Sequence, residues 1–474
     1  MTSEWPTVTI QNLIDDGVII VHKDGNHGSN YPRTSEFGDE GVPFLTAKLL
    51  DDSGNIDFLG APKLSSDKAN KFKFGFIESE DVLLSHNATV GRVAVVPEIE
   101  GRVLIGTSLT HFRLDSSRLL PQYLAAYFSG LQFQNQLASV MSQTTRNQVP
   151  ITSQRKLSVV VPSMDVQTQI AAMLGCFENK IRNISRTNKT LEEIAQALFK
   201  SWFVDFDPVK AKMEALAAGG SQADAELAAM SVISAKTPEE LKSLKESSPE
   251  AYTKLRDTAA LFPFAMKESD LGMIPEGWDI KPFSKLAKLD TTSVKPNSCP
   301  DKVWEHFSIP AFDAHSSPSY ELGKTIKSGK YKVNRYSILS SKLNPHFPRT
   351  WWPDVEDGEG AICSTEFMQF VPIKEDHRSF IYGMIVSAPF QQGILARVTG
   401  STGSRQRAQP PQVANMDVIV PDDSLISAYS DRIHPLHETS AKNIKMNLVL
   451  SNLRDTLLPK LLSGEIDFSS EAHG

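Results

Sequence analysis

The sequence predicts a mixed α/β (α+β) protein in which two similar globular domains are joined by two long, antiparallel coiled-coil helices. The first observation behind this prediction is an internal repeat, because one constant offset carries Arg146 onto Arg405 without a gap. The same offset aligns residues 159–162, Val-Val-Val-Pro, with residues 418–421, Val-Ile-Val-Pro. The second observation is a coiled-coil pattern that follows the first of these segments. Since an internal repeat determines architecture before local motifs do, we expect each half to contain a domain, a strand and a long helix.

The long-helix prediction rests on residues spaced alternately four and three apart between Ile170 and Trp202. This spacing is typical of a coiled-coil seam, which needs a partner helix. Asn188 is a polar residue within the seam, and such residues often fix the register of two helices. The natural partner is the repeated helix at about 424–462, although its seam is interrupted by Ser440, Asn443 and Asn447. Pro435 should kink that helix or delay its start.

These patterns divide the chain into five parts. Residues 1–162 are predicted to form the first globular domain, and residues 163–210 the first long helix. Residues 211–270 are rich in Ala, Glu, Lys and Ser, which predicts an insertion or linker of exposed helices or a mobile segment. Residues 271–421 form the second domain, and residues 422–474 the second long helix.

Composition limits the classes of protein that fit. In 474 residues no apolar run approaches the ~20 residues that span a bilayer, so we expect no membrane association. The N-terminal residues lack a signal pattern, and the three cysteines are scattered, which favours a reducing cytoplasm. The net charge of −7 argues weakly against a nonspecific polyanion binder. It leaves specific DNA binding open, because DNA footprints are local.

Catalytic and metal-binding motifs are not found. Gly323-Lys324-Thr325 fails as a phosphate loop because Pro318 stands where the first Gly is required. There is no Asn/Asp-Pro-Pro-Tyr/Phe methyltransferase motif. His434 and His437 lack a nearby third ligand, so we predict surface histidines rather than a metal site. We therefore expect no catalytic residues, no metal and no cofactor in this chain.

Three segments carry a resemblance to a known family. Residues 191–209, LEEIAQALFKSWFVDFDPV, closely resemble the central conserved region of the specificity subunits of type I restriction-modification systems. Residues 271–278, LGMIPEGW, look like the lead-in to that family's second target-recognition domain, and residues 453–466, LRDTLLPKLLSGEI, look like its distal conserved region. The chain departs from the family in an insertion at 215–261 that is longer than the usual linker. It also has residues 344–349, NPHFPR, in place of a Gly-containing loop.

The resemblance implies a non-catalytic subunit. Each target-recognition domain would read one half of a bipartite, asymmetric double-stranded DNA site, and the helices would set the gap. The helices would also dock two modification subunits, which bind S-adenosylmethionine and methylate adenine, and restriction subunits would join the full complex. The partner-binding candidates in the two conserved regions are Phe199, Trp202, Phe203, Phe206, Leu458 and Leu461.

Base reading needs side chains with paired donors and acceptors on loops that reach a groove, such as Arg for guanine and Asn or Gln for adenine. The loops 22–33, 86–92 and 142–148 offer such residues in the first domain, and the loops 344–349 and 399–407 in the second. The DNA-binding candidates are Lys23, His27, Asn30, Arg33, Asn87, Arg92, Arg146, Asn147, Gln148, His346, Arg349, Ser401, Arg405, Gln406 and Arg407.

Alternative interpretations remain open at this stage. Polar loops are usually solvated turns, and only the repeat raises the weight of Arg146 and Arg405. Trp351 and Trp352 are predicted to be core or interface residues rather than a base wedge. A self-contained restriction or modification enzyme would need the motifs found missing above. The main alternative is a non-catalytic coiled-coil scaffold that joins two protein-binding domains.

Overall fold

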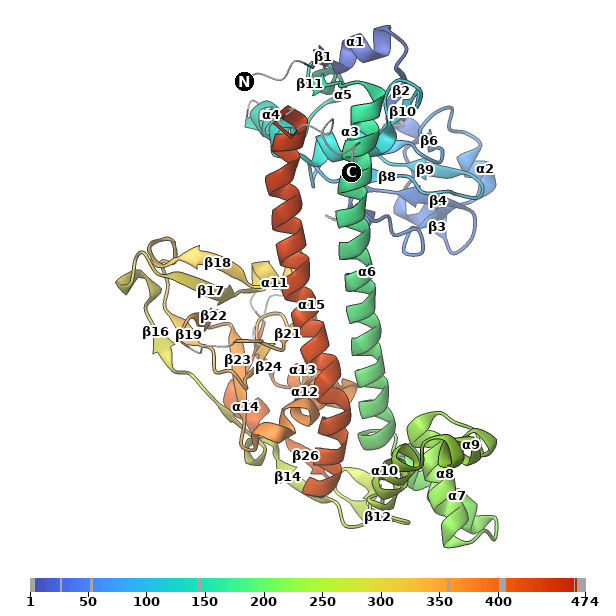
Figure 1. The fold of residues 1–474 in the computed structure, drawn as a ribbon, viewed down its shortest axis with the longest axis vertical. Coiled ribbons are helices and arrows are strands. Elements are labelled where there is room, and N and C mark those ends of the chain that lie inside the picture. The colour runs from blue at the N-terminus through green and yellow to red at the C-terminus, as the bar shows by residue number, and fades with distance from the viewer. Residues whose placement is uncertain are drawn as a thin grey trace, which may run out of the picture. The chain divides into compact units, whose positions relative to one another are not determined.

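The computed structural model describes residues 5–25, 28–51, 54–142, 147–355, 359–399, 406–463 and 465–466. The DNA-binding candidates His27, Arg146, Ser401 and Arg405 lie outside the described residues. The chain divides into two compact units, Met1–Asn183 with Val449–Gly474 (unit 1) and Ile184–Leu448 (unit 2). Each unit holds one globular domain and a part of both long helices (Figure 1).

The globular domain of unit 1 contains two sheets. A four-stranded antiparallel sheet has the order β2 (Ile19–Asp24), β10 (Leu109–Leu114), β7 (Val82–Ser85), β8 (Val93–Val95). A five-stranded sheet has the order β3 (Phe37–Gly38), β5 (Lys63–Leu64), β4 (Val42–Leu45), β9 (Val103–Ile105), β6 (Phe76–Ile77), with β4 and β9 parallel. The smaller elements are β1 (Thr7–Thr9), α1 (Ile10–Asp15), α2 (Ser66–Ala69), α5 (Ile151–Gln154) and β11 (Ser158–Val160), with β1 paired to β11.

Side chains that alternate between the two faces of the four-stranded sheet pack it against the neighbouring layers of unit 1. Successive side chains of a strand point to opposite faces of the sheet. Leu83 of β7 joins the core shared with the five-stranded sheet, which includes Leu45 and Ile105. Val82 and Leu84 face the other core, which is covered by α3 (Pro121–Ser129) and α4 (Leu131–Ser142). The four-stranded sheet is therefore buried on both faces.

The globular domain of unit 2 repeats this topology except for one edge strand of its five-stranded sheet, which pairs at the opposite edge. Its four-stranded sheet has the order β15 (Ala287–Leu289), β23 (Phe367–Pro372), β20 (Ile338–Ser341), β21 (Thr350–Trp351). Its five-stranded sheet has the order β16 (Ser293–Val294), β19 (Lys330–Lys332), β22 (Ala361–Cys363), β17 (Val303–Phe307), β18 (Ser319–Leu322), again with one parallel pair, β17 and β22. Helices α12 (Arg378–Val386) and α13 (Ala388–Leu395) take the places of α3 and α4, and β14 (Asp279–Pro282) pairs with β26 (Asp417–Val420) as β1 does with β11. The predicted α+β class and internal pseudo-repeat are confirmed.

The remaining elements of unit 2 are α11 (Ile309–His315), α14 (Pro410–Ala414) and two short antiparallel pairs. Strand β12 (Met266–Ser269) pairs with β13 (Gly272–Pro275), and β24 (Val398–Thr399) pairs with β25 (Arg407–Ala408).

The long helices are α6 (Met164–Phe203) and α15 (Asp423–Ser463). In unit 2 their contacts run in opposite directions along the chain, because the hydroxyl of Tyr429 donates to the carbonyl of Ala195 at 3.3 Å and Asn447 Nδ2 donates to Ser185 Oγ at 3.0 Å. In unit 1, Leu458 and Leu461 of α15 share a core with residues of α6 such as Ile170. The predicted antiparallel pairing is confirmed. Pro435 does not delay the start of α15, which begins at Asp423.

The polar residues in the two helical seams form hydrogen bonds with one another. Asn188 Nδ2 donates to the Ser440 carbonyl at 3.1 Å, and Asn443 Nδ2 donates to Asn188 Oδ1 at 2.8 Å. Two of the residues that interrupt the seam of α15, Ser440 and Asn443, are therefore partners of Asn188, while the third, Asn447, bonds to Ser185. This match favours one register, since any shift would leave buried polar groups unpaired.

The segment predicted as an insertion or linker is helical. It consists of α7 (Asp207–Ala217), α8 (Gln222–Ser234), α9 (Pro238–Ser247) and α10 (Pro249–Ala260), which form the helical cluster at the end of α6 in Figure 1. Capping boxes at Ser221 and Thr237 begin α8 and α9. The predicted range 163–210 for the first long helix is corrected, because α6 ends at Phe203. There Phe206 takes a positive φ of 58° and Pro208 opens α7.

Candidate nucleic-acid interface

In unit 1 the structure brings two of the candidate loops together. Residues 86–91, which follow β7, lie against residues 147–149, which precede α5. The backbone N–H of Ala88 donates to the Asn147 carbonyl at 3.3 Å, and the N–H of Val149 donates to the His86 carbonyl at 2.8 Å. Asn87 and Gln148 form a β-bridge between these two bonds. We call these two segments the loop pair of unit 1.

Unit 2 has the same arrangement. Residues 342–348 follow β20 and lie against residues 406–408. The N–H of Asn344 donates to the Gln406 carbonyl at 3.0 Å, and the N–H of Ala408 donates to the Lys342 carbonyl at 2.9 Å. Leu343 and Arg407 form the equivalent bridge. These segments are the loop pair of unit 2.

Two further features show that the loop pairs are equivalent. Ala88 and Asn344 both adopt a positive φ, 65° and 48°, at the residue that follows the bridge. Such a conformation is uncommon outside Gly. Both first loops share a backbone bond at the base, from the Ser85 N–H to the Arg92 carbonyl at 2.8 Å and from the Ser341 N–H to the Arg349 carbonyl at 2.9 Å. The same backbone platform thus occurs in both domains with different side chains.

The loop pairs display several of the predicted DNA-binding residues. Asn147 and His346 are exposed, while Asn87, Gln148 and Gln406 are half-buried. Arg146 and Arg405 directly precede Asn147 and Gln406 in the sequence. Beside the loop pair of unit 1 is a shallow hollow lined by Ala88, Val90, Ala138, Met141, Ser142 and Asn147. Amide side chains above such a surface can offer paired donors and acceptors to base edges.

Three of the four described arginines among the candidates form side-chain bonds within the protein. Arg92 Nη1 donates to the Leu50 carbonyl at 2.7 Å. Arg349 forms a two-point ion pair with Asp313 at 2.5 and 2.9 Å. Arg407 forms one with Glu366 at 3.0 and 3.0 Å. Arg349 and Arg407 stay predicted DNA-binding residues, and in this structure the carboxylates hold the paired donors that a guanine would need.

The loop after β2 leaves the same edge of the four-stranded sheet as the loop after β7, since Asp24 and Ser85 pair with Thr110 and Leu109 of the strand between them. Lys23, Asn30 and Arg33 are exposed, and the N–H of Arg33 donates to Glu36 Oε2 at 2.7 Å. The backbone bonds that join the loop pair of unit 1 do not involve this segment. These three exposed residues stay predicted DNA-binding residues.

The six partner-binding candidates are placed inside the chain. Phe199, Trp202, Phe203 and Phe206 lie in the core of unit 2, where rings such as Tyr429 and Trp278 pack against them. Leu458 and Leu461 lie in the core of unit 1. The prediction that these side chains contact a partner is corrected, since all six are buried by the protein itself.

A buried polar network supports the loop pair of unit 1. His22 Nε2 donates to Gln154 Oε1 at 3.2 Å, Gln154 Nε2 donates to Thr110 Oγ1 at 2.9 Å, and the Thr110 hydroxyl lies 2.8 Å from His86 Nδ1. Gln154 Nε2 also donates to the Val149 carbonyl at 3.0 Å. Burial lowers the pKa of His22 to about 4 and lowers that of His86 as well. Both imidazoles are therefore neutral near pH 7 and position the loops without offering charge to DNA.

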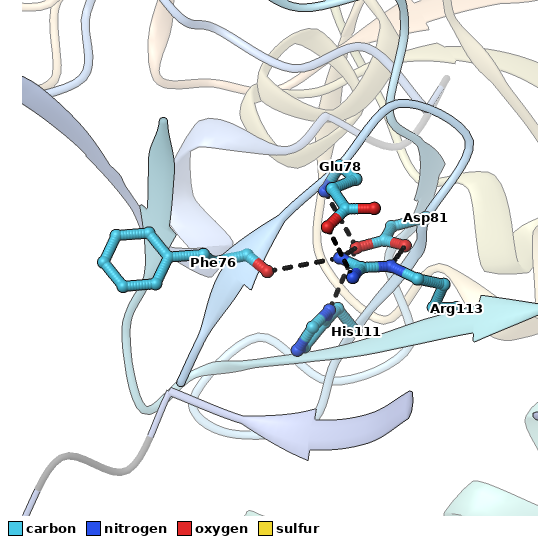
Figure 2. Close-up of polar contacts among 5 residues, drawn as sticks. All are labelled: Phe76, Glu78, Asp81, His111 and Arg113. Carbon is cyan, nitrogen blue, oxygen red and sulfur yellow. Dashed lines mark hydrogen bonds and ion pairs between the residues drawn. The ribbon is translucent and has the colours of Figure 1, made fainter. Parts of the chain in front are cut away.

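A second network lies at the other end of β7, in Figure 2. Arg113 donates through Nε and Nη2 to the two oxygens of Asp81, both at 2.9 Å, and through Nη1 to Glu78 Oε1 at 2.6 Å. His111 Nδ1 lies 3.0 Å from Asp81 Oδ2, and the N–H of Glu78 donates to the same oxygen at 3.0 Å. This cluster ties β7 to β10. Its two halves lie about 30 residues apart in the chain, so no local sequence pattern reveals it.

The structure also bears on metal and membrane binding. His437 is buried between Trp352 and Tyr382, with ring centroids 4.4 and 4.7 Å away, so the prediction of a surface histidine is wrong for this residue. Within the described ranges, no three His, Cys, Asp or Glu side chains are grouped as a metal site would require. In the same ranges, no helix combines the length and apolar character needed to cross a bilayer.

Comparison with known proteins agrees with this architecture. Residues 34–193 match the family model of the type I restriction modification DNA specificity domain. The chain is 31% identical over 337 residues to the type I restriction enzyme HindI specificity subunit of Haemophilus influenzae, which covers 67% of this chain and 71% of that protein. It is 22% identical over 456 residues to the MjaIX specificity subunit of Methanocaldococcus jannaschii, covering 93% and 90% of the two chains.

A solved structure shares the fold. The type I restriction-modification S subunit of M. genitalium superposes with a TM-score of 0.51 at 13% identity, over 97% of this chain and 96% of that one. The chain therefore belongs to the specificity subunits of type I restriction-modification systems.

Proposed function

We propose that this chain reads a bipartite, asymmetric double-stranded DNA site for a type I restriction-modification complex. Each globular domain reads one half of the site through its loop pair, and the paired helices set the gap between the halves. The observation that carries the proposal is the loop pair itself, built twice on the same backbone hydrogen bonds. Two equivalent surfaces with one topology are suited to two half-sites.

The DNA site is asymmetric in this proposal because the two loop pairs carry different side chains. Asn87 in the bridge of unit 1 is replaced by Leu343 in unit 2, and Gln148 is replaced by Arg407. Asn147 is exposed, and the equivalent Gln406 is half-buried. Side-chain donors and acceptors select bases by their geometry. Two loop pairs with different side chains therefore read different half-sites. Arg146 and Arg405, which occupy equivalent places in the sequence, remain candidates for the phosphate or base contacts.

The partners in this proposal are two modification subunits and, in the full complex, restriction subunits. The modification subunits bind S-adenosylmethionine and methylate adenine, while this chain supplies specificity. Docking needs exposed apolar surface, and Val449 and Leu453 provide it one turn apart on α15, as Ile194 does on α6. We assign the complex to the cytoplasm, where exposed thiols such as Cys176 and Cys299 stay reduced.

The test is to co-express the chain with its neighbouring modification subunit and to map methylated adenines by long-read sequencing. We expect a split motif with two defined halves and a fixed gap. Asn147→Ala should relax one half of the motif, and Gln406→Ala should relax the other. Asn297→Ala, which replaces an exposed asparagine of unit 2 outside the loop pair, should leave the motif unchanged.

Two outcomes would overturn the proposal. If an active complex methylates without a split motif, or if methylation persists when this chain is deleted, the scaffold alternative is favoured. If both variants relax the same half of the motif, the assignment of one half-site to each domain is wrong.

A further inference from the structure

The loop pair of unit 2 carries an exposed aromatic side chain that the sequence analysis did not single out. Phe347 is 67% exposed and lies in the first loop of this pair, next to the exposed His346. Large apolar side chains are usually buried, so a phenyl ring held in solvent on a candidate binding surface requires an explanation.

The equivalent loop of unit 1 has no such residue. Both loops are closed by the same backbone bond, from Ser85 to Arg92 and from Ser341 to Arg349, but the loop of unit 2 is one residue longer. Just before the closing arginine, unit 1 has Gly91, whereas unit 2 has Phe347 and Pro348. Gly91 has a φ of 100°, which L residues rarely adopt, and a Cβ there would lie 2.4 Å from Gln134 Oε1, so a side chain at this position of unit 1 would be strained. The aromatic residue is thus specific to the second domain.

The loop holds Phe347 in a defined position. The N–H of Phe347 donates to the Asn344 carbonyl at 2.9 Å, which closes a turn. Arg349 Nη1 donates to the Phe347 carbonyl at 3.1 Å, while the other donors of this guanidinium hold Asp313. Pro345 and Pro348 restrict the backbone on both sides. A braced turn loses little further conformational freedom when its tip binds a ligand.

We propose that Phe347 contacts the apolar surface of a base in the half-site read by unit 2. This inference rests on the proposed function, since it assigns a contact within the same loop pair. The loop joins residues 406–408 through the bonds from Asn344 and Ala408, so the ring belongs to the surface that displays Gln406. Phe347 therefore adds an apolar reader to a polar platform, and Arg349 positions it.

Two base surfaces share the chemistry that a phenyl ring recognises. One is the thymine methyl group, which apolar side chains contact in the major groove. The other is the face of a base at a partly unstacked step, against which an apolar wedge packs. Each predicts a different response to modified DNA.

The experiment uses the complex of this chain with its modification subunit and a duplex that carries the mapped motif. Phe347→Ala should weaken binding about 5- to 150-fold, the range expected when an aromatic contact to one base is lost. Binding to a duplex without the motif should be unchanged. The affinity of Phe347→Leu for the motif should lie between those of wild type and Phe347→Ala. Tyr320→Ala, which removes a 54% exposed aromatic ring from β18 of the same domain, should bind like wild type.

Modified duplexes distinguish the two base surfaces. If the ring contacts a thymine methyl group, replacing thymines of that half-site by uracil should weaken wild type and leave Phe347→Ala unaffected. If the ring packs against an unstacked base, 2-aminopurine in that half-site should fluoresce more strongly with wild type than with Phe347→Ala.

The inference is overturned if Phe347→Ala binds the motif as wild type does, or if affinity falls while neither modified duplex responds. In both cases the proposed function stands, because wild type still reads its motif. A wild-type complex that shows no preference for any motif would instead overturn the proposed function. Unchanged thermal unfolding of Phe347→Ala confirms that the variant is folded.

Discussion

Replacing Asp81 by Ala is expected to destabilise the globular domain of unit 1. The Asp81 carboxylate is buried and accepts hydrogen bonds from His111, from two donors of Arg113 and from the backbone N–H of Glu78 (Figure 2). Removing one partner of a buried ion pair leaves the other charge without compensation, which costs about 3–5 kcal/mol. Arg113 is 24% exposed and keeps its bond to Glu78, so we expect the lower end, about 3 kcal/mol.

This loss corresponds to a fall in Tm of about 6–12 °C, since a domain of ~150–250 residues shifts by about 2–4 °C per kcal/mol. The assay is hydrogen exchange followed by mass spectrometry during chemical denaturation. Amides of β7 and β10 should lose protection, whereas those of β20 and β23 in unit 2 serve as an internal reference. Asp257→Ala, which breaks an exposed ion pair with Arg256, is the matched control and should leave protection unchanged.

The effect depends on pH in a defined direction. Burial alone would raise the pKa of the Asp81 carboxyl, but the bonds from His111, Arg113 and Glu78 outweigh it, so this pKa is lowered. A lowered folded-state pKa stabilises the fold above the unfolded-state value of about 4, and this stabilisation disappears as pH falls through the folded-state pKa. The difference between wild type and Asp81→Ala should therefore shrink in acid. A loss below about 1 kcal/mol near pH 7, or equal loss of protection in both units, would refute this reasoning.

Three further predictions concern unit 2. Trp202→Ala removes a fully buried indole from the core and should cost about 3–5 kcal/mol in denaturant unfolding, whereas Ile194→Ala at an exposed position of the same helix should cost little. Asn188→Ala leaves the Asn443 amide without its acceptor in the helical seam and should cost about 1 kcal/mol, and a double mutant with Asn443→Ala should recover part of that loss if the pair is coupled. Burial lowers the pKa of His437 to about 3, so unfolding takes up a proton below the unfolded-state value of about 6.5 and stability should fall as pH drops from there. His437→Phe should flatten this part of the pH–stability curve, and an unchanged slope would show that other groups cause it.

Some functional inferences needed no coordinates. The offset between Arg146 and Arg405 predicted the duplicated fold, and the structure repeats both the strand order of the four-stranded sheet and the loop pair. The seam from Ile170 to Trp202 predicted the helix pairing, because its period depends only on neighbours along the chain. Trp351 was predicted to be core rather than a base wedge, and it is buried beside Phe307.

Other inferences failed because they depend on partners that are distant in sequence. Phe199 and Trp202 looked like partner-binding residues, but they are buried in the core of unit 2, where both pack against Tyr429 of α15. The sequence also did not reveal that Arg349 and Arg407, predicted to bind DNA, pair with Asp313 and Glu366. The carboxylate that pairs with an arginine can be distant in the chain, so the residues next to that arginine in the sequence do not reveal the pair.

The sequence by itself determined the repeat, the two long helices and the family to which the chain belongs, since each rests on spacing or motifs that are local in the chain. Only the tertiary structure decided which loops meet. Residues 86–91 and 147–149 are joined by backbone bonds that no local pattern encodes, and the equivalent loop in unit 2 exposes Phe347 because Arg349 and two prolines hold its turn. Exposure, ion pairing and loop contact are properties of packing between distant segments, and for that reason they required the fold.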